Sequence, residues 1–176
     1  MTQNLTLKVL EKTDLDFLHR LYNDPDVMYF WFREPFLSRV TVEENFEKSR
    51  ENKNHKSFVL KDNDDLVGII QLFDVDFVHR KAEFAIMIDP LMQGKGYALP
   101  ATHLAIDYSF TTLNLNKLYL IADVDNEKAI HIYEKAGFTQ EAILKQEYFV
   151  NGEYHDITYM SCFQEDYLKQ KRVQSN

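Results

Sequence analysis

Two short segments carry residue types that can bind and transform a small molecule. The first is the glycine-rich turn Gln93-Gly94-Lys95-Gly96-Tyr97-Ala98, and the second is a helical pattern that runs from Asn126 through Tyr133 to Gly137. Glycines let the backbone approach a ligand, and a following helix adds the positive charge of its N-terminus. Together the two segments predict transfer from a coenzyme that carries a pyrophosphate.

The second segment predicts a phenol on one face of a capped helix. Asn126, Ala129 and Tyr133 lie three and four residues apart, and Gly137 is placed to end the helix in a left-handed conformation. A purely structural interpretation stays open for both segments, since the glycines can serve a tight turn and the tyrosine can anchor the core. The turn has neither the glycines of a dinucleotide fingerprint nor the Gly-Lys-Ser/Thr of a P-loop. It therefore indicates a different phosphate-bearing ligand.

A series of strands must position these segments. Residues 57–61, 66–75 and 82–88 alternate in polarity and follow one another through short connections, which predicts an antiparallel meander. In the last of them, Glu83 and Phe84 face opposite sides of the sheet. Further strands are expected at 5–9, at 118–122 and from residue 138 onward, with a type I′ hairpin at Asn151-Gly152.

Helices are predicted between these strands. Thr41 and Glu44 have the spacing of a capping box and predict the start of an acidic helix. The aromatic segment 28–32 is either a wall of a substrate site or a loop packed on the core. Other helices are expected at 15–22, 99–113, 126–137 and 164–171.

Composition predicts a single domain, 1–176, because 45% of the 176 residues are hydrophobic and no linker interrupts them. The formal charge of −8 argues against nucleic-acid and membrane-surface binding and is compatible with a cationic substrate. Cys162 is the single cysteine and has apolar neighbours, which predicts a buried thiol in a cytoplasmic protein. Neither a signal peptide nor a membrane span is expected. The six histidines have no metal-ligand spacing, so no metal is expected.

The order of elements and the two segments resemble the GNAT acetyltransferase family over nearly the whole chain. Four further stretches are similar to bacterial spermidine/spermine N-acetyltransferases: Tyr29-Phe30-Trp31-Phe32-Arg33-Glu34-Pro35, His79-Arg80-x-Ala82-Glu83-Phe84, Asp107-Tyr108-Ser109-Phe110-x-x-Leu113-Asn114-Leu115 and Ala129-Ile130-His131-Ile132-Tyr133-Glu134. The resemblance implies an α/β GNAT fold, in which helices flank a mixed, mostly antiparallel central sheet and a splayed strand pair holds acetyl-CoA. It also implies a symmetric homo-oligomer, which can be large.

The resemblance also implies where acetyl-CoA binds. The pyrophosphate would lie on the backbone of residues 93–99, the pantetheine arm would pair with the main chain of residues 86–88, and residues 126–135 would flank the thiol end. The residues expected to contact the coenzyme are Ile86, Met87, Ile88, Gln93, Gly94, Lys95, Gly96, Tyr97, Ala98, Leu99, Asn126, Lys128, Ala129, Ile132 and Lys135.

Tyr133 is the implied general acid. Attack of an amine on the thioester expels a thiolate, which a phenol with a pKa near 10 can protonate. The amine itself arrives as an ammonium ion and must first lose a proton. Glu83 is expected to anchor that ammonium or to relay its proton through water, and the alternative is that Glu83 pairs with nearby Arg80.

The acceptor site departs from the family pattern. Relatives carry Glu-Glu between the Trp-Phe pair and the proline, and here the first position is Arg33; Leu37, Arg39 and Thr41 continue the change. Some of the polyamine carboxylates of the family are therefore absent. The remaining acidic residues of the region are Glu34, Glu43, Glu44, Glu47, Asp74, Asp76 and Glu83. Expected acceptor contacts are Met28, Glu34, Asp74, Glu83 and Ala85.

Three functions follow from these residues. The first is transfer of an acetyl group from acetyl-CoA to a primary amine of the polyamines spermidine or spermine by direct attack. The second keeps the chemistry but changes the acceptor to a protein N-terminus or an aminoglycoside, which Arg33 and the thinned acidic segment favour. The third is a sensor of acetyl-CoA or polyamine without turnover, which the presence of Tyr133 disfavours.

Overall fold

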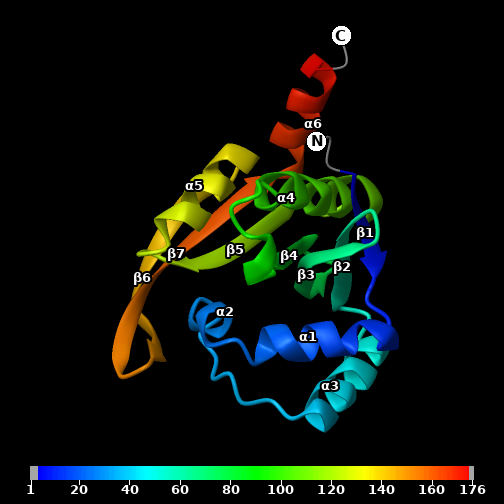
Figure 1. Ribbon diagram of the computed structural model, residues 1–176. Helices are drawn as coiled ribbons and strands as arrows, with labels where there is room; N and C mark the ends of the chain where they lie inside the picture. Colours follow the sequence, from blue (N-terminus) through cyan, green and yellow to red (C-terminus); the bar gives the residue numbers. More distant parts are fainter. Residues whose placement is uncertain (1–3, 175–176) are drawn as a thin grey trace.

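A seven-stranded sheet with helices on both faces forms the frame of the protein (Figure 1). The computed structural model describes residues 4–174. The strand order is β1-β2-β3-β4-β5-β7-β6, and every neighbouring pair is antiparallel except β4 and β5. The strands are β1 (Leu5–Val9), β2 (Lys56–Asp62), β3 (Asp65–Asp76), β4 (Lys81–Ile88), β5 (Lys117–Asp123), β6 (Thr139–Val150) and β7 (Glu153–Phe163). The predicted mixed, mostly antiparallel sheet is confirmed.

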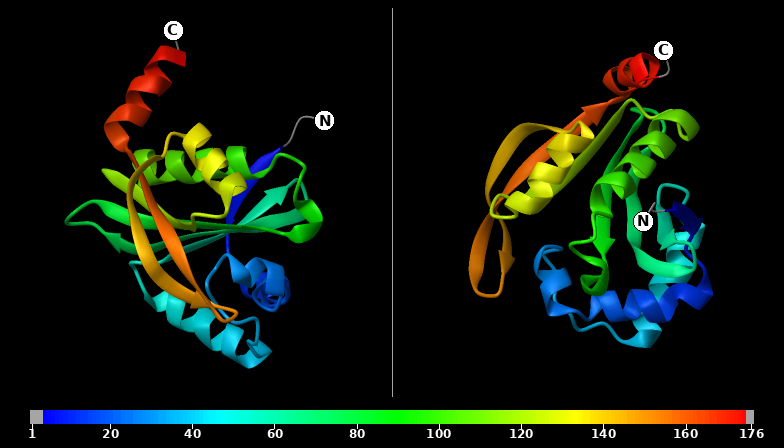
Figure 2. Two further views of the ribbon diagram at one scale, coloured as in Figure 1. Left: turned by 90° about the vertical axis from the view of Figure 1, so that its left-hand side faces the viewer. Right: turned by 45° about the horizontal axis from the view of Figure 1, so that its top comes forward.

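Helices cover both faces of the sheet. In Figure 1, α4 and α5 lie above the sheet, α1 and α3 lie below it, and α2 lies beside the β6–β7 hairpin. Figure 2 shows α6 projecting from the end of β7. The helices are α1 (Leu15–Tyr22), α2 (Pro25–Tyr29), α3 (Arg39–Glu51), α4 (Ala98–Asp107), α5 (Glu127–Ala136) and α6 (Gln164–Gln174).

One predicted helix changes its type near its end, and another begins earlier than predicted. The helix expected over 99–113 is α-helical only to Asp107 and continues as a π-helical turn over Tyr108–Thr112. The capping box at Thr41 and Glu44 does not form, because α3 already begins at Arg39. Ser38 has an extended backbone and its hydroxyl accepts the Thr41 N–H at 3.1 Å, so the true cap lies three residues earlier.

The two faces of β4 contribute to two separate cores. Phe84 packs with α4 and α5, in a cluster that includes Phe110 and Phe138. Met87, from the opposite face, packs with Leu15 and Leu21 of α1. The alternation predicted for this strand is confirmed, and it places a ligand-lining edge between two packed layers.

The sheet opens between β4 and β5, which is the feature that creates a site. The two strands run parallel and pair only at their beginnings, from Lys81↔Lys117 to Glu83↔Tyr119. Beyond these residues no pairing joins them within the part of the chain that the structure describes. The edge of β4 from residue 84 to residue 88 therefore keeps free main-chain groups on the side toward β5.

Local sequence signals determine the elements around this opening. The Asn126 side chain accepts the Ala129 N–H at 3.2 Å at the start of α5, and Gly137 ends the helix with φ 102°. The hairpin from β6 to β7 turns through Asn151 (φ 51°) and Gly152 (φ 92°), as predicted. Cys162 is buried, and burial raises the pKa of its thiol to about 12.

Candidate active site

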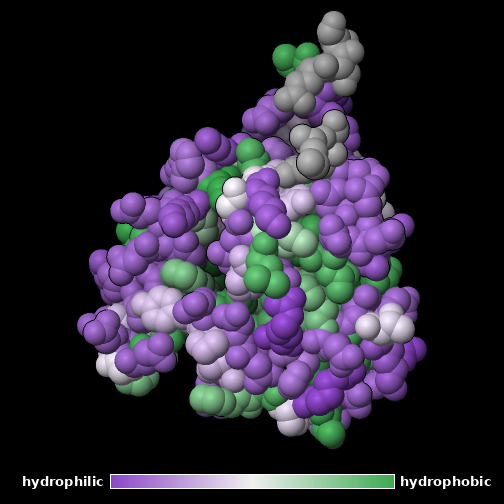
Figure 3. Space-filling view, in the orientation of Figure 1, coloured by the Kyte–Doolittle hydropathy of each residue, from purple (hydrophilic) through white to green (hydrophobic). Residues whose placement is uncertain are grey.

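A cleft of about 1320 Å³ follows the opening between β4 and β5. The N-terminal ends of α4 and α5, the α2 segment and Tyr148 of β6 also line it. Figure 3 shows hydrophobic residues gathered toward the middle of this face of the molecule, with hydrophilic residues around them. The cleft is therefore an apolar slot with polar groups at defined positions, which is the usual character of a small-molecule site.

One end of the cleft is a backbone cradle before α4. Gly94 and Gly96 have φ values of 74° and 82°, a conformation that glycine adopts without strain. Tyr97 precedes the helix, and no side chain within residues 4–174 caps its first N–H groups. These N–H groups and the positive end of α4 can therefore bind a phosphate. The cradle fits the pyrophosphate that the sequence predicts.

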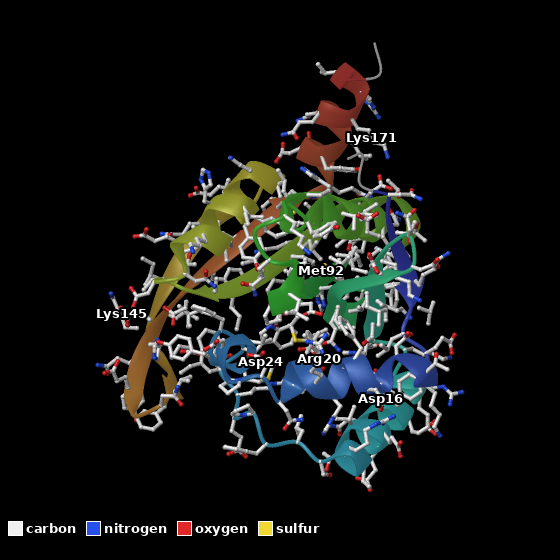
Figure 4. All side chains as sticks on the ribbon, viewed as in Figure 1. Asp16, Arg20, Asp24, Met92, Lys145 and Lys171 are labelled. Carbon is white, nitrogen blue, oxygen red and sulfur yellow. The ribbon has the colours of Figure 1, made fainter. Side chains whose placement is uncertain are left out.

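An ion pair fixes the chain that leads into the cradle. Arg20 points from α1 toward the sheet (Figure 4) and donates to both carboxylate oxygens of Asp89 at 3.1 and 2.5 Å. Asp89 is 3% exposed and also accepts the Leu91 N–H. The Arg20 guanidinium holds the pKa of Asp89 below its usual range. α1 is thus tied to the segment between β4 and the glycines.

The free edge of β4 forms one long wall of the cleft. Ile86, Met87 and Ile88 all line it. Behind them, a Cβ atom at Gly68 of β3 would lie 2.2 Å from the Met87 carbonyl oxygen. Only glycine lets β3 approach so closely, and a side chain there would displace the Met87 main chain. The wall can therefore pair with an amide-bearing ligand as an added strand does.

α5 forms the opposite wall and carries Tyr133. The ring of Tyr133 packs edge-on against Phe84 at 6.3 Å and Phe138 at 6.0 Å. Burial raises the pKa of its phenol to about 12. In the described part of the chain no group hydrogen-bonds the Tyr133 hydroxyl, although the residue lines the cleft. The phenol is therefore protonated at neutral pH and free to donate to a ligand.

Most predicted coenzyme contacts lie together in this cleft. Lys95 does not line it: its side chain is exposed and donates to the Met92 sulfur at 3.3 Å. The residues that do line it, besides Tyr133, are Ile86, Met87, Ile88, Gln93, Gly94, Gly96, Tyr97, Ala98, Leu99, Asn126, Lys128, Ala129, Ile132 and Lys135.

Two carboxylates, Glu83 of β4 and Asp74 of β3, also line the cleft. Glu83 is half-buried, and burial, reinforced by nearby Asp74, raises its pKa; Arg33 opposes the shift. The alternative pairing of Glu83 with Arg80 does not occur, because Arg80 donates to Asn114 and Gln164 instead. Ala85 lines the cleft beside them. This corner has the charge and the partial burial to hold a cation.

Two of the predicted acceptor contacts lie elsewhere. Met28 is only 1% exposed and packs in the core with α1 and α3, so it is not part of the cleft lining. Glu34 is exposed and also lies outside that lining. Arg39 pairs with Asp16 at 2.8 Å and with Glu43 at 3.1 Å. Arg39, which differs from the family pattern, therefore joins α3 to α1 through an ion pair.

Aromatic side chains complete the acceptor side of the cleft. Phe32 stacks on Tyr148 of β6 with ring centroids 4.5 Å apart. Trp31 meets Phe73 edge-on at 6.4 Å. The segment 28–32 therefore has both of the predicted roles, because Met28 packs in the core while Trp31 and Phe32 line the cleft. No local signal pointed to Tyr148, because its position depends on the pairing of the hairpin.

Acidic residues near the start of α5 were also missed. Asp123, Asp125 and Glu127 line the cleft where β5 ends, as does Asp26 of α2. Across residues 4–174 no group of three or more His, Cys, Asp or Glu side chains is arranged to hold a metal ion. Over the same range, no helix is long and apolar enough to cross a membrane.

Comparisons with known proteins agree with this geometry. Residues 4–139 match the family described as an acetyltransferase (GNAT) domain. The chain is 43% identical over 169 residues to a spermidine N(1)-acetyltransferase of Vibrio cholerae serotype O1, covering 96% of this chain and 98% of the relative.

Two solved structures from Vibrio cholerae share the fold. A spermidine N-acetyltransferase in complex with CoA and spermine has a TM-score of 0.91 at 44% identity, covering 93% of this chain and 98% of that one. A dodecameric structure of spermidine N-acetyltransferase in an intermediate state has a TM-score of 0.85 at 43% identity, covering 94% and 97%.

Proposed function

Because the chain belongs to the GNAT family and is an acetyl-CoA-dependent N-acetyltransferase, we propose that it acetylates a primary amine of spermidine or spermine. The observation that carries the proposal is the corner formed by Glu83 and Asp74 at the end of the coenzyme cleft. A half-buried carboxylate beside a second acid costs free energy unless a cation joins it. A polyamine ammonium is such a cation, and the aromatic side chains nearby suit its methylene chain and its charge.

Tyr133 is the proposed general acid. The neutral acceptor amine forms a bond to the thioester carbon, the carbon–sulfur bond breaks, and the departing thiolate takes the phenol proton. The proton that the new amide nitrogen gives up restores the phenol through water. Two observations support this role: Tyr133 lines the cleft, and burial raises the pKa of its phenol to about 12. The acid is therefore fully protonated at neutral pH when the thiolate forms.

Glu83 is the proposed anchor of the acceptor ammonium. Its raised pKa makes it a better proton acceptor than an ordinary glutamate, so it also suits a relay of the ammonium proton through water. Asp74 adds negative charge at the same corner. Ala85, next to Glu83, leaves space for the reacting end of the chain.

Steady-state kinetics with a panel of acceptors tests the proposal. CoA release is measured with spermidine, spermine, a diamine, an aminoglycoside and a peptide with a free N-terminus. Saturable turnover with the polyamines, at a kcat/KM at least tenfold above that of the other acceptors, is expected. No turnover above background with any polyamine would contradict the proposed substrate.

Arg33 favours a second candidate, an acceptor that carries an anionic group beside its amine, such as a peptide N-terminus. Arg33 lines the cleft and is close enough to Glu83 to oppose the rise of its pKa. A guanidinium there repels a polycation and attracts a carboxylate. Preference for the peptide over both polyamines in the same panel would support this candidate.

We also propose that the protein is a cytoplasmic homo-oligomer. β6 forms an edge of the sheet, and exposed apolar side chains occur at Ile143 and Phe149 on it, and at Tyr154 of β7. An open edge with apolar groups is suited to pairing with another copy. Size-exclusion chromatography with light scattering tests this, and a monomer at micromolar concentration would contradict it.

A further inference from the structure

A carboxylate and an imidazole are buried together where β5 ends. Asp123 is 2% exposed and His155 of β7 is 7% exposed, and Asp123 Oδ2 lies 2.6 Å from His155 Nδ1. His155 is the direct neighbour of Tyr148 across the β6–β7 hairpin. Tyr29 at the end of α2 meets the imidazole edge-on at 5.4 Å. The pair therefore lies where α2 and the hairpin come together (Figure 1).

Asp123 organises the turn that leads from β5 into α5. Its second carboxylate oxygen, Oδ1, accepts the Asp125 N–H at 2.9 Å, and its main-chain carbonyl accepts the Asn126 N–H at 3.0 Å. Asn126 in turn caps α5 through the Ala129 N–H. Both carboxylate oxygens are thus occupied, and the hydrogen bonds run in sequence from β7 to the first turn of α5.

Stability alone does not account for this pair. His155 Nε2 is buried and has no hydrogen-bond partner within residues 4–174. A buried polar atom without a partner is unfavourable, and an apolar pair of similar size is commonly as stable or more so. The pair instead fixes the position of the Asp123 carboxylate. The His155 imidazole donates to it through Nδ1 on one side, and the β5–α5 turn donates to it on the other.

We propose that Asp123 and His155 are a positioning pair for the coenzyme, which set the β5–α5 turn and so place Asn126 and the start of α5 against acetyl-CoA. The inference rests on the proposed coenzyme site. Asp123 lines the cleft, whereas His155 does not, so the imidazole acts through the carboxylate. The same pair joins the acceptor side, through Tyr29 and the hairpin, to the coenzyme side.

Binding of CoA, measured by calorimetry, tests the pair without any acceptor. Asp123→Ala removes the acceptor of two donors, and His155→Ala removes the donor that holds it. Each should raise the Kd for CoA and the KM for acetyl-CoA about tenfold, while kcat at saturation changes less than about threefold. If one variant fails to fold, the other supplies the measurement. An unchanged Kd in a folded variant overturns the proposal.

The variant His155→Asn separates positioning from proton transfer. An asparagine amide nitrogen takes nearly the place of Nδ1 and can still donate to Asp123, but it has no counterpart of Nε2. Positioning predicts that His155→Asn recovers most of the coenzyme affinity lost in His155→Ala, with kcat near that of the wild type. If kcat of His155→Asn fell about 10²-fold or more below that of the wild type while its CoA affinity stayed the same, the positioning role would be contradicted. Such a result would indicate that Nε2 accepts a proton. CoA binding is measured in the absence of an acceptor, so a failure to acetylate polyamines leaves this test intact.

Discussion

Replacing Tyr133 by phenylalanine removes one hydroxyl from the cleft and leaves the packing of the ring unchanged. The ring contacts with Phe84 and Phe138 remain, and the lost hydroxyl has no hydrogen-bond partner within residues 4–174. The free energy of unfolding should therefore change by less than about 1 kcal/mol. Any large loss of activity then reflects chemistry and not folding.

The expected loss follows from general acid catalysis. Such a proton transfer contributes about 10²- to 10⁴-fold. We expect kcat to fall at least ~10²-fold, which corresponds to ~2.7 kcal/mol of transition-state stabilisation. The KM for acetyl-CoA should stay within about threefold, because the hydroxyl acts on the departing sulfur. Since burial raises the pKa of Tyr133 to about 12, wild-type kcat should not decline through loss of this proton between pH 7 and 10.

A thiol reagent that detects released CoA provides the assay. Cys162 will contribute little background, because it is buried and its pKa is raised to about 12. Tyr108→Phe is the matched control: Tyr108 packs edge-on against Phe58 at 5.0 Å and lies outside the cleft lining, so its kcat should be unchanged. A kcat for Tyr133→Phe within twofold of the wild type would refute the role of this phenol.

Three further substitutions test the two ends of the cleft. Glu83→Gln should raise the acceptor KM about tenfold, and an unchanged acceptor KM counts against the role of Glu83 as anchor. In the wild type, the acceptor KM should rise as the pH falls and Glu83 is protonated, starting at a higher pH than for an ordinary glutamate because the pKa of Glu83 is raised. Glu83→Gln should abolish this pH dependence. Gly96→Ala places a residue with a Cβ atom at φ 82°, which costs ~1–2 kcal/mol and disturbs the backbone cradle. The KM for acetyl-CoA should therefore rise several-fold, while the KM for the acceptor should not change. Arg33→Glu should lower the spermidine KM several-fold, most strongly at low salt, and the opposite change would favour an anionic acceptor.

Local periodicity made much of the fold predictable. The meander of β2, β3 and β4 follows from alternation and short turns, and α5 follows from the cap at Asn126 and the stop at Gly137. The cradle at Gly94 and Gly96 is also a local feature, because the positive φ values are properties of those residues. For the same reason the predicted coenzyme residues fall almost entirely in one cleft.

The acceptor side depends on contacts between distant segments, and there sequence reasoning was weaker. Met28 and Trp31 are three residues apart, yet one packs under the sheet and the other lines the cleft, a choice set by how α2 meets the core. Tyr148 reaches the cleft, and His155 reaches Asp123, only through the register of the β6–β7 hairpin. Nothing in the spacing of Asp123 and His155 indicates that they meet.

The central claim is transfer of an acetyl group to a polyamine, and mass spectrometry of the products tests it most directly. The purified protein is incubated with acetyl-CoA and spermidine, and the acetylated amine and the released CoA are quantified in the same sample. The proposed function predicts one acetylated spermidine for each CoA released, with both lost in Tyr133→Phe. CoA release without an acetylated polyamine, or no reaction at all, would contradict it.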